Sequence, residues 1–204
     1  FIGADVTVRS SAPLTAEARA VVDDVLRSPD ALARAELVET QTMAGGLEGR
    51  GTGIVRLVEI MGVDPGFPFY GTFEMAGGAT WSPALVEHQG VVVPPQLLVE
   101  LGLEVGDVLR LGGRNFTIRA VVMRDRLQRG DGFAFGPRVY VSASDLKSTA
   151  LLGFGSRATY QVAVKARDAA MPGLATALRT RLGRQAVVRD WRSLEDRLGQ
   201  NIAV

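Results

Sequence analysis

The opening part of the chain shows two hydrophobic patterns, one typical of strands and one typical of a helix. In residues 4–10, apolar and polar side chains alternate, as in a strand with one buried side. Residues 16–26 place their apolar side chains on one helical face, and Thr15 precedes them as a candidate N-cap. Residues 33–44 and 52–60 again have strand patterns, and the Gly-rich turn between them predicts a hairpin.

The closing part repeats this order. Residues 158–166 alternate like a strand, and Asp168 can cap a helix that begins near Pro172. A short strand follows at 186–191, and residues 192–204 predict a last helix. The first of these helices has an apolar face made of Met171, Leu174, Leu178 and Leu182. The last one carries Leu194, Leu198 and Ile202 on one side.

A β-α-β unit therefore opens the chain and another closes it. This arrangement predicts an α+β fold with split, ferredoxin-like (porter-like) units and with helices on one face of a sheet. We expect residues 1–61 and 157–204 to form one discontinuous subdomain. Residues 62–156 are rich in Gly and short strands, so they predict a small β-rich inserted subdomain.

Within the insert, the clearest pattern runs from residue 91 to residue 122. Pro94 and Pro95 end a strand and open a helical turn, and Gly102 suits a left-handed C-terminal position. A strand at 108–111 and a Gly-rich turn lead into a return strand with alternating apolar residues. Those residues are Phe116, Ile118, Ala120 and Val122. A further strand then leads to a turn expected to be capped at Ser144 and Asp145.

Aromatic residues concentrate in the stretch "VEIMGVDPGFPFYGTFE", residues 58–74. Its four aromatics are the candidate partner or substrate contacts of this chain: Phe67, Phe69, Tyr70 and Phe73. In one interpretation they wedge the junction between the two subdomains, because Pro and Gly beside aromatics suit a rigid crossover. In the other they form an apolar rim that meets a partner or a hydrophobic ligand.

Composition excludes several classes of protein. The 204 residues are 47% hydrophobic and 22% charged, with a net charge of +1, so nothing indicates an electrostatic grip on nucleic acid. The absence of Cys excludes a disulfide scaffold, a Cys-ligated metal and a Cys nucleophile. No run reaches the roughly 18 apolar residues of a membrane span.

Candidate chemistry is sparse, so we expect no catalytic residue, no cofactor site and no metal site. His88 is the single His and is interpreted as a surface-loop residue. The charged stretch 124–132 is typical of a solvated hairpin tip. The Gly-rich turn at 45–51 lacks the Lys-Ser/Thr of a phosphate loop. The carboxylates of polar faces show no acid/base pairing; they include Glu36, Glu39, Glu100 and Glu104.

The order of these pieces resembles the MacB-like periplasmic core domain of FtsX/MacB-family ABC transporter permeases, and most closely the YbbP-type subgroup. The matching pieces are "ADVTVRSSAPL", "VRLVEIMGVDPGFPFYG", "LLVELGLEVGDVLRLGGRNFTIRAVV", "FGPRVYVSASDL", "GSRATYQVAVK" and "DWRSLEDRL". Together they cover nearly the whole chain.

The resemblance implies a periplasmic domain placed between two transmembrane helices of an inner-membrane permease. Phe1 would follow one span, and the helix ending near Val204 would run into the next as a lever. It also implies a cytoplasmic ABC ATPase as partner and, in the YbbP subgroup, a periplasmic lipase or esterase. The domain would couple helix motion to the export or extraction of a hydrophobic compound, lipid or lipoprotein.

Two alternatives stay open. The pattern "LGLEVGDVLRL" also resembles AbrB-like and double-psi small barrels, which would make the chain a soluble binding module, some of whose relatives bind DNA. A hydrolase that uses His88 is the other alternative, although no nucleophile motif accompanies that residue.

Overall fold

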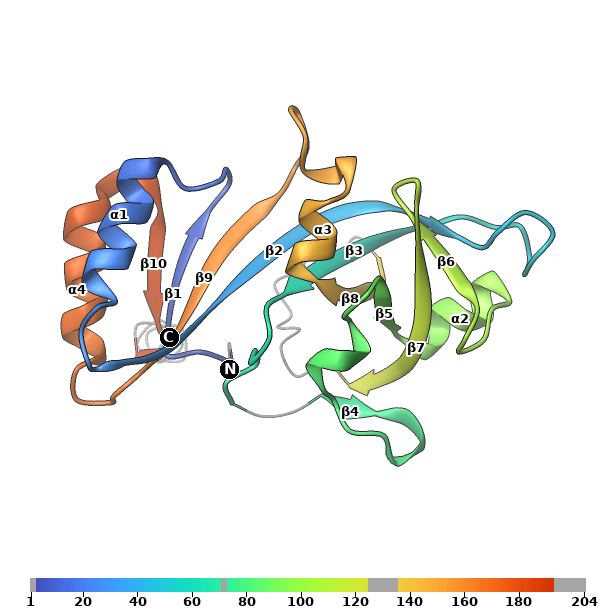
Figure 1. Ribbon diagram of the computed structural model, residues 1–204, viewed down its shortest axis with the longest axis horizontal. Helices are drawn as coiled ribbons and strands as arrows, with labels where there is room; N and C mark the ends of the chain where they lie inside the picture. The colour runs from blue at the N-terminus through green and yellow to red at the C-terminus, as the bar shows by residue number, and fades with distance from the viewer. Residues whose placement is uncertain (1–2, 71–72, 125–135, 193–204) are drawn as a thin grey trace, which may run out of the picture.

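The computed structural model describes residues 3–70, 73–124 and 136–192 of the chain. In this part, ten strands join one sheet in the order β10-β1-β9-β2-β3-β8-β5-β7-β4, and β6 pairs with both β2 and β7. Figure 1 shows two parts side by side, an α+β part with two helices and a β-rich part, with the long strand β2 running from one to the other.

The α+β part contains two β-α-β units that are far apart in the sequence. The first consists of β1 (Val6–Ser10), α1 (Ala16–Val25) and β2 (Ala31–Gly45). The second consists of β9 (Thr159–Ala166), α4 (Met171–Leu182) and β10 (Val187–Asp190). Their strands are ordered β10-β1-β9-β2, and each neighbouring pair is antiparallel. This is the split ferredoxin-like arrangement that the sequence predicts.

Helices α1 and α4 cover one face of these strands (Figure 1). The Thr15 hydroxyl accepts a hydrogen bond of 3.1 Å from the Ala18 amide, which confirms Thr15 as the N-cap of α1. The expected cap of α4 was wrong: Ala170 occupies the N-cap and makes no side-chain hydrogen bond. The predicted apolar face of α4 is confirmed, since all four of its residues are buried: Met171, Leu174, Leu178 and Leu182.

The β-rich part closes into a barrel. Its strands follow one another around the barrel as β2, β3 (Arg56–Val63), β8 (Arg138–Ser142), β5 (Gly90–Val93), β7 (Arg114–Arg124) and β6 (Val108–Leu111). Strand β6 then returns to β2, where Ala44 faces Leu111. The predicted hairpins β2–β3 and β6–β7 are both confirmed. Closure removes the open sheet edges that would otherwise expose unpaired backbone groups.

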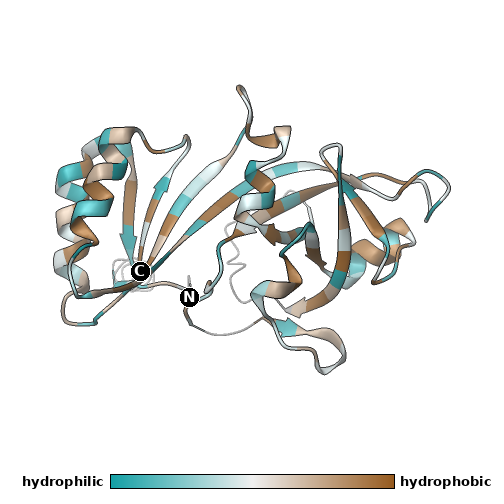
Figure 2. Ribbon diagram, viewed as in Figure 1, coloured by the Kyte–Doolittle hydropathy of each residue, from teal (hydrophilic) through white to brown (hydrophobic). Residues whose placement is uncertain are grey.

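Apolar side chains from every strand of the barrel fill its interior. Of the four residues in the predicted alternation, Phe116 and Ile118 lie in the barrel core, whereas Ala120 and Val122 belong to a separate apolar cluster. The barrel strands carry many apolar residues (brown in Figure 2). Helix α2 (Pro95–Leu101) lines the barrel with Leu97 and Leu101, and it ends at Gly102 with a left-handed φ of 62°, as expected. Burial of these side chains is the main force that stabilises the barrel.

Helix α3 (Ala143–Lys147) follows β8 directly. Its N-cap is Ser142, whose hydroxyl accepts a hydrogen bond of 3.1 Å from the Asp145 amide. The sequence placed this cap at Ser144, which is an error of two residues. Strand β8 ends one residue before α3 begins, so the cap coincides with the last strand residue and leaves no separate turn.

A crossover leads from β3 to β5 along the outside of the barrel. It contains the short strand β4 (Glu74–Met75) and the 3₁₀ turns η1 (Ala76–Gly78) and η2 (Pro83–Leu85). Two other 3₁₀ turns, η3 (Ala150–Leu152) and η4 (Gly183–Gln185), follow α3 and α4. The crossover buries a second apolar cluster against the sheet, on the face opposite α1 and α4.

Two predicted features lie outside the described residues. One is the last helix with Leu194, Leu198 and Ile202, and the other is nearly all of the charged stretch 124–132. The division into 1–61 with 157–204 and 62–156 stays a proposal. Strand β2 is shared by both parts, because it pairs with β9 in one and with β6 in the other.

Candidate functional site

A groove lies between the two parts, on the face of the sheet that carries the helices. The floor of the groove is formed by β1, β9 and β2. Residues that face one another across these strands lie in two neighbouring rows. One row is Val8–Val162–Glu36, and the next contains Tyr160 and Val38. Helix α1 and the segment before it form one wall, while α3 and η3 form the other. The groove has a volume of about 280 Å³ and a mostly apolar lining.

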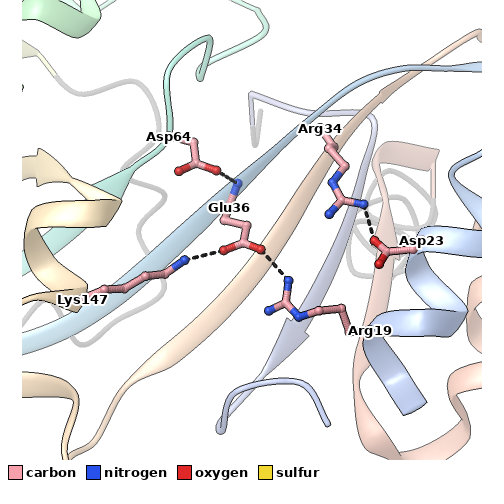
Figure 3. A network of polar contacts seen from close by, with 6 residues as sticks. All are labelled: Arg19, Asp23, Arg34, Glu36, Asp64 and Lys147. Atoms are coloured by element: carbon pink, nitrogen blue, oxygen red, sulfur yellow. Dashed lines mark hydrogen bonds and ion pairs between the residues drawn. The ribbon is translucent and has the colours of Figure 1, made fainter. Parts of the chain in front are cut away.

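Glu36 bridges this groove (Figure 3). Its Oε1 accepts a hydrogen bond of 2.8 Å from Nη1 of Arg19 on α1, and its Oε2 accepts one of 2.5 Å from Nζ of Lys147 on α3. One carboxylate therefore joins the α+β part to the barrel side of the groove. We call Arg19, Glu36 and Lys147 the groove bridge.

The two cations stabilise the ionised form of Glu36. The hydrogen bond from Lys147, followed by the one from Arg19, lowers the pKa of Glu36 to about 2. The Glu36 amide also donates to Oδ2 of Asp64 at 2.7 Å, and the Asp64 amide donates back to the Glu36 carbonyl at 3.2 Å. Asp64 follows β3, so this pair holds the start of the crossover against β2 (Figure 3).

Sequence reasoning missed the groove bridge. It treated Glu36 as one of several carboxylates on polar faces and did not single out either cation as a partner. The three residues are 17 and 111 positions apart and belong to α1, β2 and α3. No local spacing rule connects them, so the only available signal was the alternation that puts Glu36 on the same strand face as Val38.

The aromatic crossover contacts the segment that leads into β1. The Tyr70 hydroxyl donates a hydrogen bond of 2.8 Å to Oδ2 of Asp5, and the Phe69 amide donates one of 3.1 Å to the Gly3 carbonyl. Burial first, and then the hydrogen bond to Asp5, raise the pKa of Tyr70 to about 12, so the hydroxyl keeps its proton at neutral pH. Nζ of Lys165 lies 5.3 Å from the centre of the Tyr70 ring.

The other aromatics of the stretch pack internally. Phe67 and Phe73 are each 4% exposed and belong to the cluster beneath the crossover. The Phe73 ring lies 4.4 Å from Trp81 and 4.7 Å from Tyr140, and Phe69 packs edge-on against Phe67 at 6.0 Å. The structure thus brings all four residues to one side of the sheet, while their role as partner or substrate contacts stays a prediction.

His88 and the acidic residues are the other candidates for chemistry that the structure places. His88 is exposed in the loop before β5, with a φ of 51°. Within residues 3–70, 73–124 and 136–192, no three His, Asp or Glu side chains lie close enough together to hold a metal ion. In the same residues, none of the helices has the length and apolar character needed to cross a membrane.

Comparison with known proteins identifies the class of this domain. Residues 2–181 match the family described as the MacB-like periplasmic core domain, which is nearly nine tenths of the chain. The chain therefore belongs to this family, and it is a periplasmic domain of an ABC transporter permease of the inner membrane.

A curated relative is the ABC transporter permease YbbP of Escherichia coli (strain K12). It is 27% identical over 107 residues, which is 52% of this chain and 13% of the relative. The matched part thus spans about an eighth of that protein's length.

Solved structures share the fold at low sequence identity. The periplasmic region of MacB from Actinobacillus actinomycetemcomitans is 11% identical, with a TM-score of 0.61 over 97% of this chain and 94% of that one. The extracellular domain of the ABC-type transporter YknZ from Gram-positive bacteria is 13% identical, with a TM-score of 0.57 over 91% of this chain and 99% of that one.

These matches place the domain in a transporter family rather than in an enzyme family. The pattern that resembled a small barrel, residues 101–111, ends in β6, which is a strand of the closed barrel. That barrel is one part of a MacB-like domain.

Proposed function

We propose that this domain is a non-catalytic coupling element of its permease. It converts movements of the membrane helices into movements on the outer side of the membrane. The energy comes from ATP hydrolysis by a separate cytoplasmic ATPase, and the work is export or extraction of a hydrophobic compound, a lipid or a lipoprotein. The periplasmic lipase or esterase expected from the resemblance stays a prediction.

The observation that supports this proposal is the meeting of three chain segments at Asp5. Its Oδ2 accepts hydrogen bonds of 2.8 Å from both the Tyr70 hydroxyl and the Ala166 amide, and its carbonyl accepts one of 3.3 Å from the Trp191 amide. Asp5 is 6% exposed, so these bonds are shielded from water. A displacement of the chain before β1 is therefore passed to the crossover, and from there to the barrel.

The groove bridge gives a second connection between the same two parts. The bridge joins α1 to α3 on one face of the sheet, whereas Asp5 and Tyr70 join the N-terminal segment to the crossover on the other. Strand β2 runs between these two connections. With these contacts in place, a displacement of the chain before β1 would pull on the crossover and so move the barrel relative to the α+β part.

The test uses the full-length permease assembled with its ATPase in a bilayer. Residues 1–204 contain no Cys, so spin labels placed at Arg27 and Val99, both 80% exposed, report the separation of the two parts. We expect the distance distribution to shift when the ATPase is trapped with ATP and vanadate. Tyr70→Phe should reduce this shift while ATP hydrolysis continues, and Tyr160→Phe should leave it unchanged. A wild-type distribution that is identical in both nucleotide states would contradict the proposal.

A further inference from the structure

We propose that the groove between α1 and α3 binds a small anionic amphiphile, with its apolar body on the sheet and its acidic group between Arg19 and Lys147. This site is a property of the folded domain and goes beyond the coupling role. Its test needs neither transport nor ATP, so the two proposals can fail separately.

The shape of the groove comes from a gap in the helical layer. Helices α1 and α4 cover β10, β1 and part of β9, and α3 covers the barrel side, while the strands between them have no helix above them (Figure 1). The floor there is formed by the buried Val8 and Val162 and the half-buried Tyr160, and the walls add the half-buried Leu14 and Leu152. Apolar surface left open in this way favours an apolar occupant.

The size of the groove limits the occupant. With a volume of about 280 Å³, the groove holds a small molecule and not a large one. This volume is near the lower end of the range for ligand pockets. A medium-length alkyl chain or a single aromatic ring system fits, whereas a folded protein segment does not.

The charges define the sign of the polar group. Two cations and one carboxylate line the groove, so its lining carries one net positive charge. Glu36 engages one nitrogen of Arg19, and the side chains of Arg19 and Lys147 are 47% and 48% exposed. Guanidinium and ammonium groups have five and three donors, so N–H groups remain available at the groove mouth for an incoming anion. A cationic head group would meet like charge at the same place.

Such a ligand would also act on the groove bridge. Its acidic group would compete with Glu36 for Lys147, and this would loosen the direct tie between α1 and α3. Binding in the groove would therefore favour a wider separation of the two parts.

The experiment follows amide chemical shifts of the ¹⁵N-labelled 204-residue chain during titration with decanoate. Decylammonium serves as the comparison, because it has the same alkyl chain and the opposite charge. We expect decanoate to change the amide chemical shifts of β9, β2 and α3 around the groove in a saturable way. Decylammonium should bind at least about tenfold more weakly. Lys147→Gln should weaken the binding of decanoate about tenfold, which is the effect of losing one charge-assisted hydrogen bond. Lys165→Gln removes the other lysine of the chain, which lies outside the groove, and should leave the affinity unchanged.

A second variant tests the apolar floor without changing the charge. Leu152→Trp should fill the groove and abolish the saturable shifts while the remaining spectrum stays that of the wild type. The proposal is overturned if decylammonium binds as well as decanoate, or if Lys147→Gln binds like the wild type. Shifts that scatter over other apolar surfaces, such as the exposed Ile54 and Val55 of the β2–β3 hairpin, would overturn it as well.

Discussion

The Tyr70 hydroxyl donates a hydrogen bond of 2.8 Å to Oδ2 of Asp5, across 65 residues of sequence. Tyr70 belongs to the crossover that leaves the barrel strand β3, and Asp5 immediately precedes β1 in the α+β part. The aromatic stretch therefore includes a direct polar contact between the crossover and the N-terminal segment, in addition to its apolar packing. This contact gives the proposed coupling role a residue pair that mutation can test.

Removal of this contact should lower the stability of the domain. In Tyr70→Phe the buried Asp5 carboxylate loses one donor and keeps the Ala166 amide. We expect a loss of about 1–3 kcal/mol in the free energy of unfolding, measured by urea denaturation. Tyr160→Phe is the matched control, because no hydrogen bond of the Tyr160 hydroxyl is found within the described residues, and it should change the stability by less than about 0.5 kcal/mol. An equal loss in the free energy of unfolding for both variants would show that the Asp5–Tyr70 hydrogen bond does not stabilise the domain.

The packing of the crossover predicts a strong dependence on Phe73. Its ring is 4% exposed and lies between Trp81 and Tyr140, so Phe73→Ala leaves a cavity in a tightly packed cluster. We expect a loss of about 3–5 kcal/mol in the free energy of unfolding. Phe154→Ala provides the control, since Phe154 is fully exposed and its removal should cost less than about 0.5 kcal/mol. An unchanged melting temperature for Phe73→Ala would place that ring outside the core.

The groove bridge predicts a pH-dependent contribution from Glu36. Its pKa falls from an ordinary 4.5 to about 2 in the folded domain, so ionised Glu36 favours the folded state. This contribution is complete above pH 4.5 and is lost as the pH falls toward 2. We expect Glu36→Gln to cost about 1–2 kcal/mol at pH 7, because both partners are half exposed and solvent screens them. Denaturation curves at pH 7 and pH 3 should show the gap between wild type and variant shrinking at the lower pH, and a constant gap would argue against this assignment.

Two glycines of the β2–β3 turn allow a paired test of backbone contact. Gly51 and Gly53 have similar positive φ values, 70° and 74°. A Cβ on Gly51 would lie 2.2 Å from the Leu101 carbonyl oxygen, whereas a Cβ on Gly53 meets nothing within 4 Å. Gly53→Ala should cost about 1–2 kcal/mol from backbone strain alone. Gly51→Ala should cost more, because the turn must also move away from α2, and thermal unfolding of both variants measures the difference.

Short-range sequence patterns determine the local elements of this domain. Alternation in β1 and β9, the apolar face of α4 and the left-handed Gly102 each depend on neighbours within a few residues, so the sequence alone determined them. The repeated β-α-β order similarly determined the split ferredoxin-like arrangement. The helix caps show the limit of such local prediction. Thr15 was predicted correctly as the N-cap of α1. Ser142 instead of Ser144 caps α3, because the strand runs directly into the helix.

Contacts between distant segments were decided only by the tertiary structure. Closure of the barrel depends on β6 reaching back to β2, and the groove bridge depends on α1 and α3 standing on either side of Glu36. Asp5 and Tyr70 likewise meet only after the crossover has folded over the sheet. For side chains as common as Arg, Glu and Lys, the neighbouring sequence does not indicate which distant residue each one will pair with. The sequence therefore determined which elements form, and the packing of those elements determined which charges and rings come together.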